Sequence, residues 1–133
     1  MTDVPLEITV LALAGLLACA QLVLMAVPAN LQLGSGYLAG PRDEPRTLQG
    51  VPARLQRAFH NMVEGLVLFA VAATAVTLSG ASSGLTEGCA VAYLAARLAY
   101  VPLYAFGVPL WRSAVWAVGF FATVIMLGAA AAA

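Results

Sequence analysis

The chain has 133 residues, of which 62% are hydrophobic and 9% charged, with a mean hydropathy of +0.94 and no formal net charge. Soluble domains carry roughly 25% charged residues, so this composition excludes a water-facing surface and indicates an integral membrane protein. The basic residues are all arginines and form no phosphate-binding cluster, which argues against a nucleic-acid partner. The absence of lysine suggests a GC-rich, bacterial source.

The first apolar run covers Leu6 to Val27, and we expect Pro28 to end it. A helix of ~20 residues crosses a hydrocarbon core of ~30 Å, so this run is long enough to span a membrane. Cys19 lies in a segment that resembles a lipoprotein cleavage box. A secretory signal needs basic residues before its apolar core, whereas this chain has Asp3 and Glu7 there. We therefore expect an uncleaved first span.

The rest of the chain contains three further apolar runs, at about residues 54–78, 85–106 and 110–128. A polar stretch rich in glycine and proline separates the first two, and it must lie outside the hydrocarbon. A Ser-Gly turn and a Gly-Val-Pro break separate the others. The sequence predicts an all-α fold with one domain over residues 1–133, an up-and-down bundle of four transmembrane helices.

Arginine placement predicts the orientation of this bundle. Arg42, Arg46, Arg54 and Arg57 lie on or beside the first loop, and Arg112 lies at the third. The N-terminus and the second loop have no arginine. The positive-inside rule therefore places loops one and three in the cytoplasm and both termini outside, in a bacterial inner membrane.

A polar stripe opens the second predicted helix. Arg54, Arg57, Asn61 and Glu64 share one face with Leu68, because they are spaced three or four residues apart. Charged groups at membrane depth cost a few kcal/mol or more, so they face protein or a wet cavity. The structural alternative is that these residues only hold helices together.

Two other residue types are candidates for metal binding, and neither is favoured. His60 lies off the polar stripe, without a second histidine or paired acids beside it, so it reads as a hydrogen-bonded bystander rather than a ligand. Cys19 and Cys89 both lie in apolar runs and match no metal-binding spacing. We interpret them as small core residues and expect no metal site.

The third predicted helix carries a second polar stripe. Tyr93, Arg97, Tyr100 and Tyr104 lie on one face, where the tyrosines can hydrogen-bond or stack on the guanidinium. The alternative makes the tyrosines an interfacial belt, which suits Tyr104 best. Arg112 opens the fourth helix, and a positive-inside flank would by itself explain it.

Taken together, helices two, three and four each bring arginine toward the same half of the membrane, with Asn61 and Glu64 between them. Arginine forks suit carboxylates, and Glu64 suits an ammonium group. The combination predicts a small ligand that carries both carboxylates and an amine.

The same residues resemble the signature of the MAPEG family, the membrane-associated proteins in eicosanoid and glutathione metabolism. The helix-two motif R-x-x-R-A-F-H-N-x-x-E at 54–64 follows G-P-R-D at 40–43. The R-L-A-Y at 97–100, with Tyr104, and the R-S at 112–113 are similar to motifs of the third and fourth helices. The resemblance covers essentially the whole chain.

This resemblance implies a homotrimer, with glutathione between neighbouring subunits near the cytoplasmic side. Arg112 would stabilise the glutathione thiolate, because a free thiol has a pKa of about 8.5 that a nearby guanidinium lowers. The implied glutathione-binding residues are Arg57, His60, Asn61, Glu64, Arg97, Tyr100 and Tyr104.

Three positions depart from the family pattern. His60 stands where the eicosanoid enzymes have an arginine, Tyr100 where some members have histidine, and Trp116 where tyrosine is usual. Weaker glutathione binding or an altered pose is the expected consequence. The leading hypothesis is a glutathione-dependent transferase or peroxidase that takes an apolar electrophile or hydroperoxide from the lipid. The alternative is a non-catalytic membrane scaffold, and a transporter is disfavoured because no span is broken or repeated.

Overall fold

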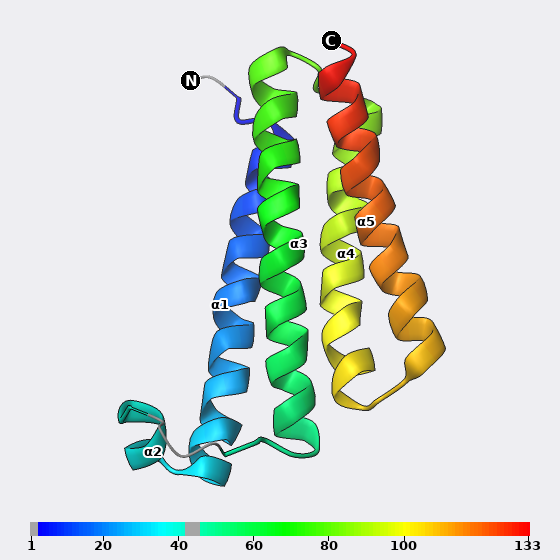
Figure 1. Cartoon of the computed structure of the whole chain (residues 1–133). Helices are drawn as coiled ribbons and strands as arrows, with labels where there is room; N and C mark the ends of the chain where they lie inside the picture. Colours follow the sequence, from blue (N-terminus) through cyan, green and yellow to red (C-terminus); the bar gives the residue numbers. More distant parts are fainter. Residues whose placement is uncertain (1–2, 42–45) are drawn as a thin grey trace.

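The computed structural model describes residues 3–41 and 46–133, which form helices and, within these ranges, no strand. The helices are α1 (Leu6–Leu33), α2 (Ser35–Ala39), α3 (Val51–Ser79), α4 (Gly84–Ala105) and α5 (Pro109–Ala131). The four long ones run alternately up and down, with both termini at one end (Figure 1). Each of these four is long and apolar enough to cross a membrane. The predicted all-α four-helix bundle is confirmed.

The first helix extends further than predicted. We expected α1 to end before Pro28, but it continues through this proline to Leu33. Proline removes one backbone hydrogen bond, and neighbouring groups commonly compensate for this loss in membrane helices. Here the Asn30 side chain donates to the Ala26 carbonyl oxygen at 2.7 Å, and the Gly34 N–H donates to the Asn30 carbonyl oxygen at 2.9 Å. The last turns of α1 are therefore hydrogen-bonded beyond the apolar run.

Two other helix boundaries differ from the prediction. The last helix continues into the alanine tail to Ala131, past the expected end near 128, because alanine has the highest intrinsic helix propensity. The second span begins at Val51 rather than Arg54 and has Pro52 in its first turn. Proline is tolerated there because the N–H groups of the first turn have no acceptor within the helix.

The first loop contains structure that the sequence analysis did not predict. The short α2 follows α1 directly, and the Gln32 side chain bridges to the far end of the loop. Its Nε2 donates to the Gln49 carbonyl oxygen at 3.1 Å, and the Gln49 N–H donates to its Oε1 at 2.8 Å. The motif residues Arg42 and Asp43 lie outside the described residues.

The centre of the bundle combines small residues with a few large ones. Ala72, Ala73 and Ala90 are completely buried, which lets the helix backbones approach closely. The rings of Phe69 on α3 and Tyr93 on α4 stack in this core, with centroids 4.0 Å apart and planes 2° from parallel. Helices α1 and α5 each pack on both α3 and α4. The α3–α4 pair is therefore the centre of the fold.

A buried carboxylate fixes the end of the bundle that carries the termini. Glu7 is completely buried, and the Ser82 hydroxyl donates to both of its oxygens, at 2.9 and 3.1 Å. The Thr86 hydroxyl donates to Oε1 at 2.6 Å. Thr86 also completes a capping box with Ser83, the N-cap of α4. Glu7 therefore ties α1 to the start of α4, a role that the sequence analysis did not assign to it.

Candidate functional site

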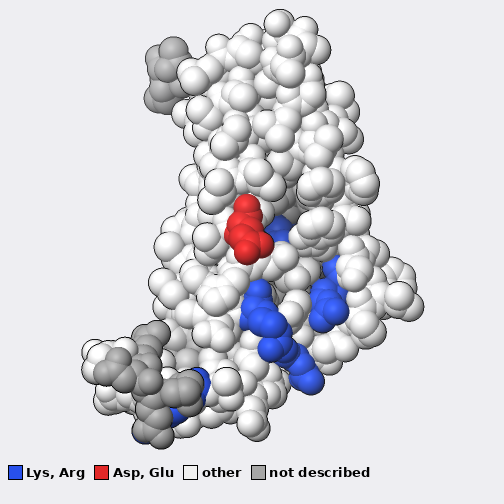
Figure 2. Space-filling view, viewed as in Figure 1, with Lys and Arg blue, Asp and Glu red and all other residues white. Residues whose placement is uncertain are grey.

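Basic side chains gather at the end of the bundle that carries the α1–α3 and α4–α5 connections (Figure 2). Arg54 on α3 donates from Nη1 to the Ala105 carbonyl oxygen at 3.4 Å, which joins α3 to the end of α4. Arg57 and Arg112 lie at the same end, and both contact Tyr104 of α4. Loops one and three thus share one end, as the orientation argument requires. The assignment of that end to the cytoplasm stays a prediction.

Tyr104 lies between two of these arginines. Arg57 donates from Nε to the Tyr104 hydroxyl oxygen at 3.0 Å. The guanidinium carbon of Arg112 lies 4.7 Å from the centroid of the Tyr104 ring, on the distance scale of a cation–π contact. Since these residues belong to α3, α4 and α5, a single tyrosine connects three helices. The connection leaves most N–H donors of both arginines available.

Arg97 is the buried cation of the bundle, with 3% of its surface exposed. Its Nη1 donates to Oδ1 of Asn61 at 2.9 Å, and its Nε contacts the Met62 sulfur at 3.3 Å. Its guanidinium carbon lies 4.5 Å from the Tyr100 ring centroid. Its Nη2 is buried and has no hydrogen-bond partner among the described residues. This guanidinium is therefore held in place but not fully hydrogen-bonded.

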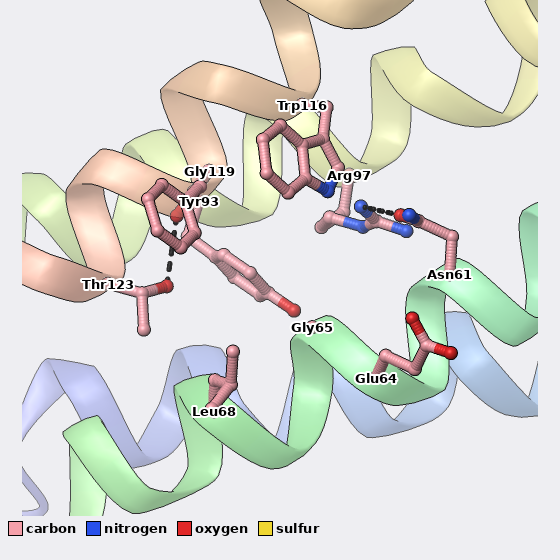
Figure 3. Close-up of a pocket in the computed structure, with 10 residues that line it drawn as sticks. Asn61, Glu64, Gly65, Leu68, Tyr93, Arg97, Trp116, Gly119 and Thr123 are labelled. Carbon is pink, nitrogen blue, oxygen red and sulfur yellow. Dashed lines mark hydrogen bonds between the residues drawn. The ribbon is translucent and has the colours of Figure 1, made fainter.

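Two cavities open beside these side chains, between α3, α4 and α5. The inner cavity measures about 140 Å³ and extends toward the middle of the bundle (Figure 3). Its lining residues are Asn61, Glu64, Gly65, Leu68, Tyr93, Arg97, Trp116, Gly119, Phe120 and Thr123. The outer cavity measures about 270 Å³ and is lined by Asn61, Tyr100, Tyr104, Arg112, Ser113 and Trp116. The two cavities meet at Asn61 and Trp116, which line both.

Most of the predicted site residues therefore lie together. The inner cavity takes Asn61, Glu64 and Arg97, the outer one takes Asn61, Tyr100, Tyr104 and Arg112, and Arg57 is attached through Tyr104. His60 is the exception, because it is exposed and lines neither cavity. Tyr93 and Tyr100 are buried inside the bundle, which disagrees with the belt alternative for these two tyrosines.

The charges at the two cavities are unbalanced. Within the described ranges, Arg57, Arg97 and Arg112 form no ion pair with a carboxylate. The acidic residue that lines the inner cavity is Glu64, which is exposed and likewise has no cationic partner among the described residues. Guanidinium groups bind carboxylates through paired N–H donors, and a free carboxylate binds an ammonium group. The arrangement can hold a ligand with more negative than positive charge.

Seven of the ten residues that line the inner cavity were not predicted as site residues, among them Gly65, Tyr93 and Thr123. Tyr93 appeared only as a member of a stripe, yet its buried hydroxyl has no hydrogen-bond partner among the described residues. Thr123 donates to the Gly119 carbonyl oxygen at 2.9 Å, and a Cβ on Gly65 would lie 3.8 Å from the Tyr93 hydroxyl oxygen. The sequence does show small residues such as Gly65 and Gly119 on these helices, and such residues permit close helix packing. Their presence alone does not predict a cavity.

A family model described as the MAPEG family matches residues 10–132. The matched range runs from within α1 to the end of α5 and includes every residue that lines the two cavities. No curated protein matches the chain.

Proposed function

The chain belongs to the MAPEG family, and from this premise we propose that it is a glutathione-dependent transferase or peroxidase. The family includes glutathione transferases and peroxidases as well as non-catalytic members, and its members generally use glutathione as a substrate or cofactor. Four apolar helices and the family together make the chain an integral membrane protein. The proposed acceptor is an apolar electrophile or hydroperoxide that arrives from the lipid.

The observation that carries this proposal is the group of arginines without carboxylate partners. Arg97 lines the inner cavity, Arg112 lines the outer one, and Arg57 is joined to the outer one through Tyr104. None of the three pairs with a carboxylate among the described residues, and an uncompensated cation is costly in an apolar bundle. Glutathione carries two carboxylates and one amine. Its charges therefore match the excess of guanidinium donors together with the single free carboxylate of Glu64.

The roles follow from position and chemistry. We assign Arg57, Asn61, Glu64 and Arg97 to the tripeptide and Arg112 to the sulfur. A thiol with a pKa of about 8.5 is only a few per cent ionised at pH 7, and a guanidinium beside it raises the ionised fraction. Arg112 can act in this way because its contact with the Tyr104 ring is a cation–π contact, and its N–H donors have no hydrogen-bond partner among the described residues.

A homotrimer with glutathione between subunits is part of the same proposal. Arg57 and His60 are exposed on one chain, and both would gain partners where another subunit covers α3. Apolar side chains such as Leu68 and Val71 are also exposed on this helix, so an assembly surface and a lipid surface are both available. Tyr100 and Tyr104 would border the site.

A second candidate, a non-catalytic membrane scaffold, is favoured by a different observation. Arg57 and Arg97 each donate to a neutral group of another helix, the Tyr104 hydroxyl and the Asn61 amide oxygen. Such interhelical hydrogen bonds stabilise membrane bundles without any ligand. In this case replacing either arginine would destabilise the fold, and glutathione would not bind.

The test is an ultraviolet difference titration of glutathione into the detergent-purified protein at pH 7, which detects thiolate. We expect a saturable thiolate band that Arg112→Ala abolishes. Arg54→Ala is the matched control, because Arg54 lies at the same end, donates to a backbone carbonyl and lines neither cavity. No band in the wild-type protein would favour the scaffold. Loss of the oligomer on size exclusion together with the band would mark Arg112 as structural.

A further inference from the structure

The Tyr93 hydroxyl is one of three buried polar atoms without a hydrogen-bond partner among the described residues, together with Nη2 of Arg97 and Oε1 of Gln21. It is buried at the level of the inner cavity, 2% of the residue is exposed, and the hydroxyl has no hydrogen-bond partner among the described residues. Nη2 of Arg97, one helical turn away, is in the same condition. Burying an unsatisfied donor costs about 1–3 kcal/mol, and lipid offers no acceptor. Both donors therefore point to an acceptor that the described chain does not supply.

The direction of this hydroxyl is fixed by packing. The Tyr93 ring stacks on Phe69 from one side. Gly119 of α5 approaches from another, so closely that a Cβ there would lie 3.5 Å from the ring carbon Cδ2. The hydroxyl points toward Gly65 (Figure 3), where a Cβ would lie 3.8 Å from it. A ring held in this way presents its donor at one place, beside a position that carries no side chain.

The inner cavity combines these donors with an apolar wall. Leu68, Trp116 and Phe120 line it and are each more than a third exposed on the surface of the bundle. The Thr123 hydroxyl already donates to the Gly119 carbonyl oxygen, so it adds no free donor. The cavity is therefore lined by apolar side chains where it opens on the surface of the bundle, and Tyr93 and Arg97 line its inner part.

We propose that the inner cavity binds the carbonyl oxygen of an apolar ketone that enters from the lipid. The Tyr93 hydroxyl donates a hydrogen bond to that oxygen, and the aliphatic chain lies against Leu68, Trp116 and Phe120. Tyr93 is then a substrate-binding residue that the family resemblance does not indicate. The ketone-binding site stands independently of glutathione, whereas its use in conjugation rests on the proposed function.

An α,β-unsaturated ketone would make this site productive. Addition of the glutathione thiolate forms a bond from sulfur to the β-carbon, and the electron pair of the C=C bond shifts to leave the charge on the carbonyl oxygen. The hydrogen bond from Tyr93 stabilises that enolate oxygen as the charge develops. A proton from water then reaches the α-carbon, which yields the thioether and requires no oxidant or reductant.

The test measures binding without glutathione, from tryptophan fluorescence of the detergent-purified full chain. The probes are 2-undecanone and 1-dodecene, which match in heavy-atom number and differ in the oxygen. The wild-type protein should prefer the ketone. One hydrogen bond corresponds to a two- to twelve-fold change in affinity, so Tyr93→Phe should weaken ketone binding by about that factor and leave dodecene binding within two-fold.

Other outcomes overturn the proposal. Equal affinity for both probes in the wild-type protein, or ketone affinity unchanged in Tyr93→Phe, would mean that the hydroxyl contacts only water. Equal losses for both probes would make Tyr93 a packing residue. Thermal unfolding supplies a second readout: because the hydroxyl has no partner in the described chain, Tyr93→Phe should melt at the wild-type temperature or above it, and a lower melting temperature would count against the proposal. A missing thiolate band would refute the proposed function alone.

Discussion

Asn61 supplies the oxygen acceptor that holds the buried Arg97 guanidinium, at 2.9 Å. Asn61→Ala would leave this cation with the Met62 sulfur and the face of the Tyr100 ring as its remaining contacts. A hydrogen bond to a charged group contributes about 1.5–3 kcal/mol. Asn61 is half-buried and borders both cavities, so water can compensate in part. We therefore expect the free energy of unfolding to fall by about 2 kcal/mol, near the low end of that range.

Thermal unfolding in detergent, followed by circular dichroism, measures this loss. Asn61→Asp is the matched control, because it keeps the acceptor oxygen and the side-chain size and should unfold at or above the wild-type temperature at neutral pH. Asn61→Ala should melt clearly below the wild-type protein. A melting temperature within one degree of wild type would refute the reasoning. The Arg97–Asn61 contact would then contribute nothing to stability, and Asn61 would serve the ligand alone.

Two further predictions concern stability and use the same unfolding assay. Ser82→Ala removes the hydroxyl that donates to both oxygens of Glu7. Because Ser82 is exposed and water can replace part of this bond, the free energy of unfolding should fall by about 1.5 kcal/mol, the low end for a bond to a charged group. An unchanged melting temperature would mean that water replaces the bond completely. At Gly119, an added Cβ would make an ordinary contact of 3.5 Å with the Tyr93 ring. Gly119→Ala should therefore be neutral or slightly stabilising, whereas Gly119→Leu should cost about 1–3 kcal/mol by overpacking the α4–α5 contact. Equal melting temperatures for these two variants would contradict the close packing.

Hydropathy was sufficient to predict the fold, because a membrane span needs only length and apolar composition. Periodicity was sufficient to place Asn61 and Glu64 on one face of α3, because residues at helical spacing share a face whatever they pack against. The contact of Asn61 with Arg97 depends on how α3 packs against α4. Helix ends were harder to predict. The sequence analysis ended α1 at Pro28, whereas the helix continues to Leu33, because a proline removes only one backbone hydrogen bond and membrane helices tolerate this loss.

Partners between helices were beyond the sequence for a physical reason. Whether Glu7 is buried depends on the α3–α4 turn bringing Ser82 to it, and these residues are far apart in the chain. The same is true of Tyr93, whose place in a stripe was evident but whose missing partner was not. Spacing determines which side chains share a face, and only the packing of neighbouring helices determines which donors are satisfied.

The charged groups at the two ends of the bundle differ in how far their hydrogen bonds are satisfied within the described chain. The Glu7 carboxylate receives hydroxyl donors from both Ser82 and Thr86, so a ligand would have to displace bonds that already exist. At the arginine end, Arg97 retains an unsatisfied Nη2, and Glu64 has no cationic partner among the described residues. A satisfied buried group stabilises one conformation, whereas an unsatisfied one carries a cost that a bound molecule can remove. The unsatisfied groups between α3, α4 and α5 therefore support the proposal that a ligand binds there, whereas the Glu7 carboxylate is already bonded within the chain.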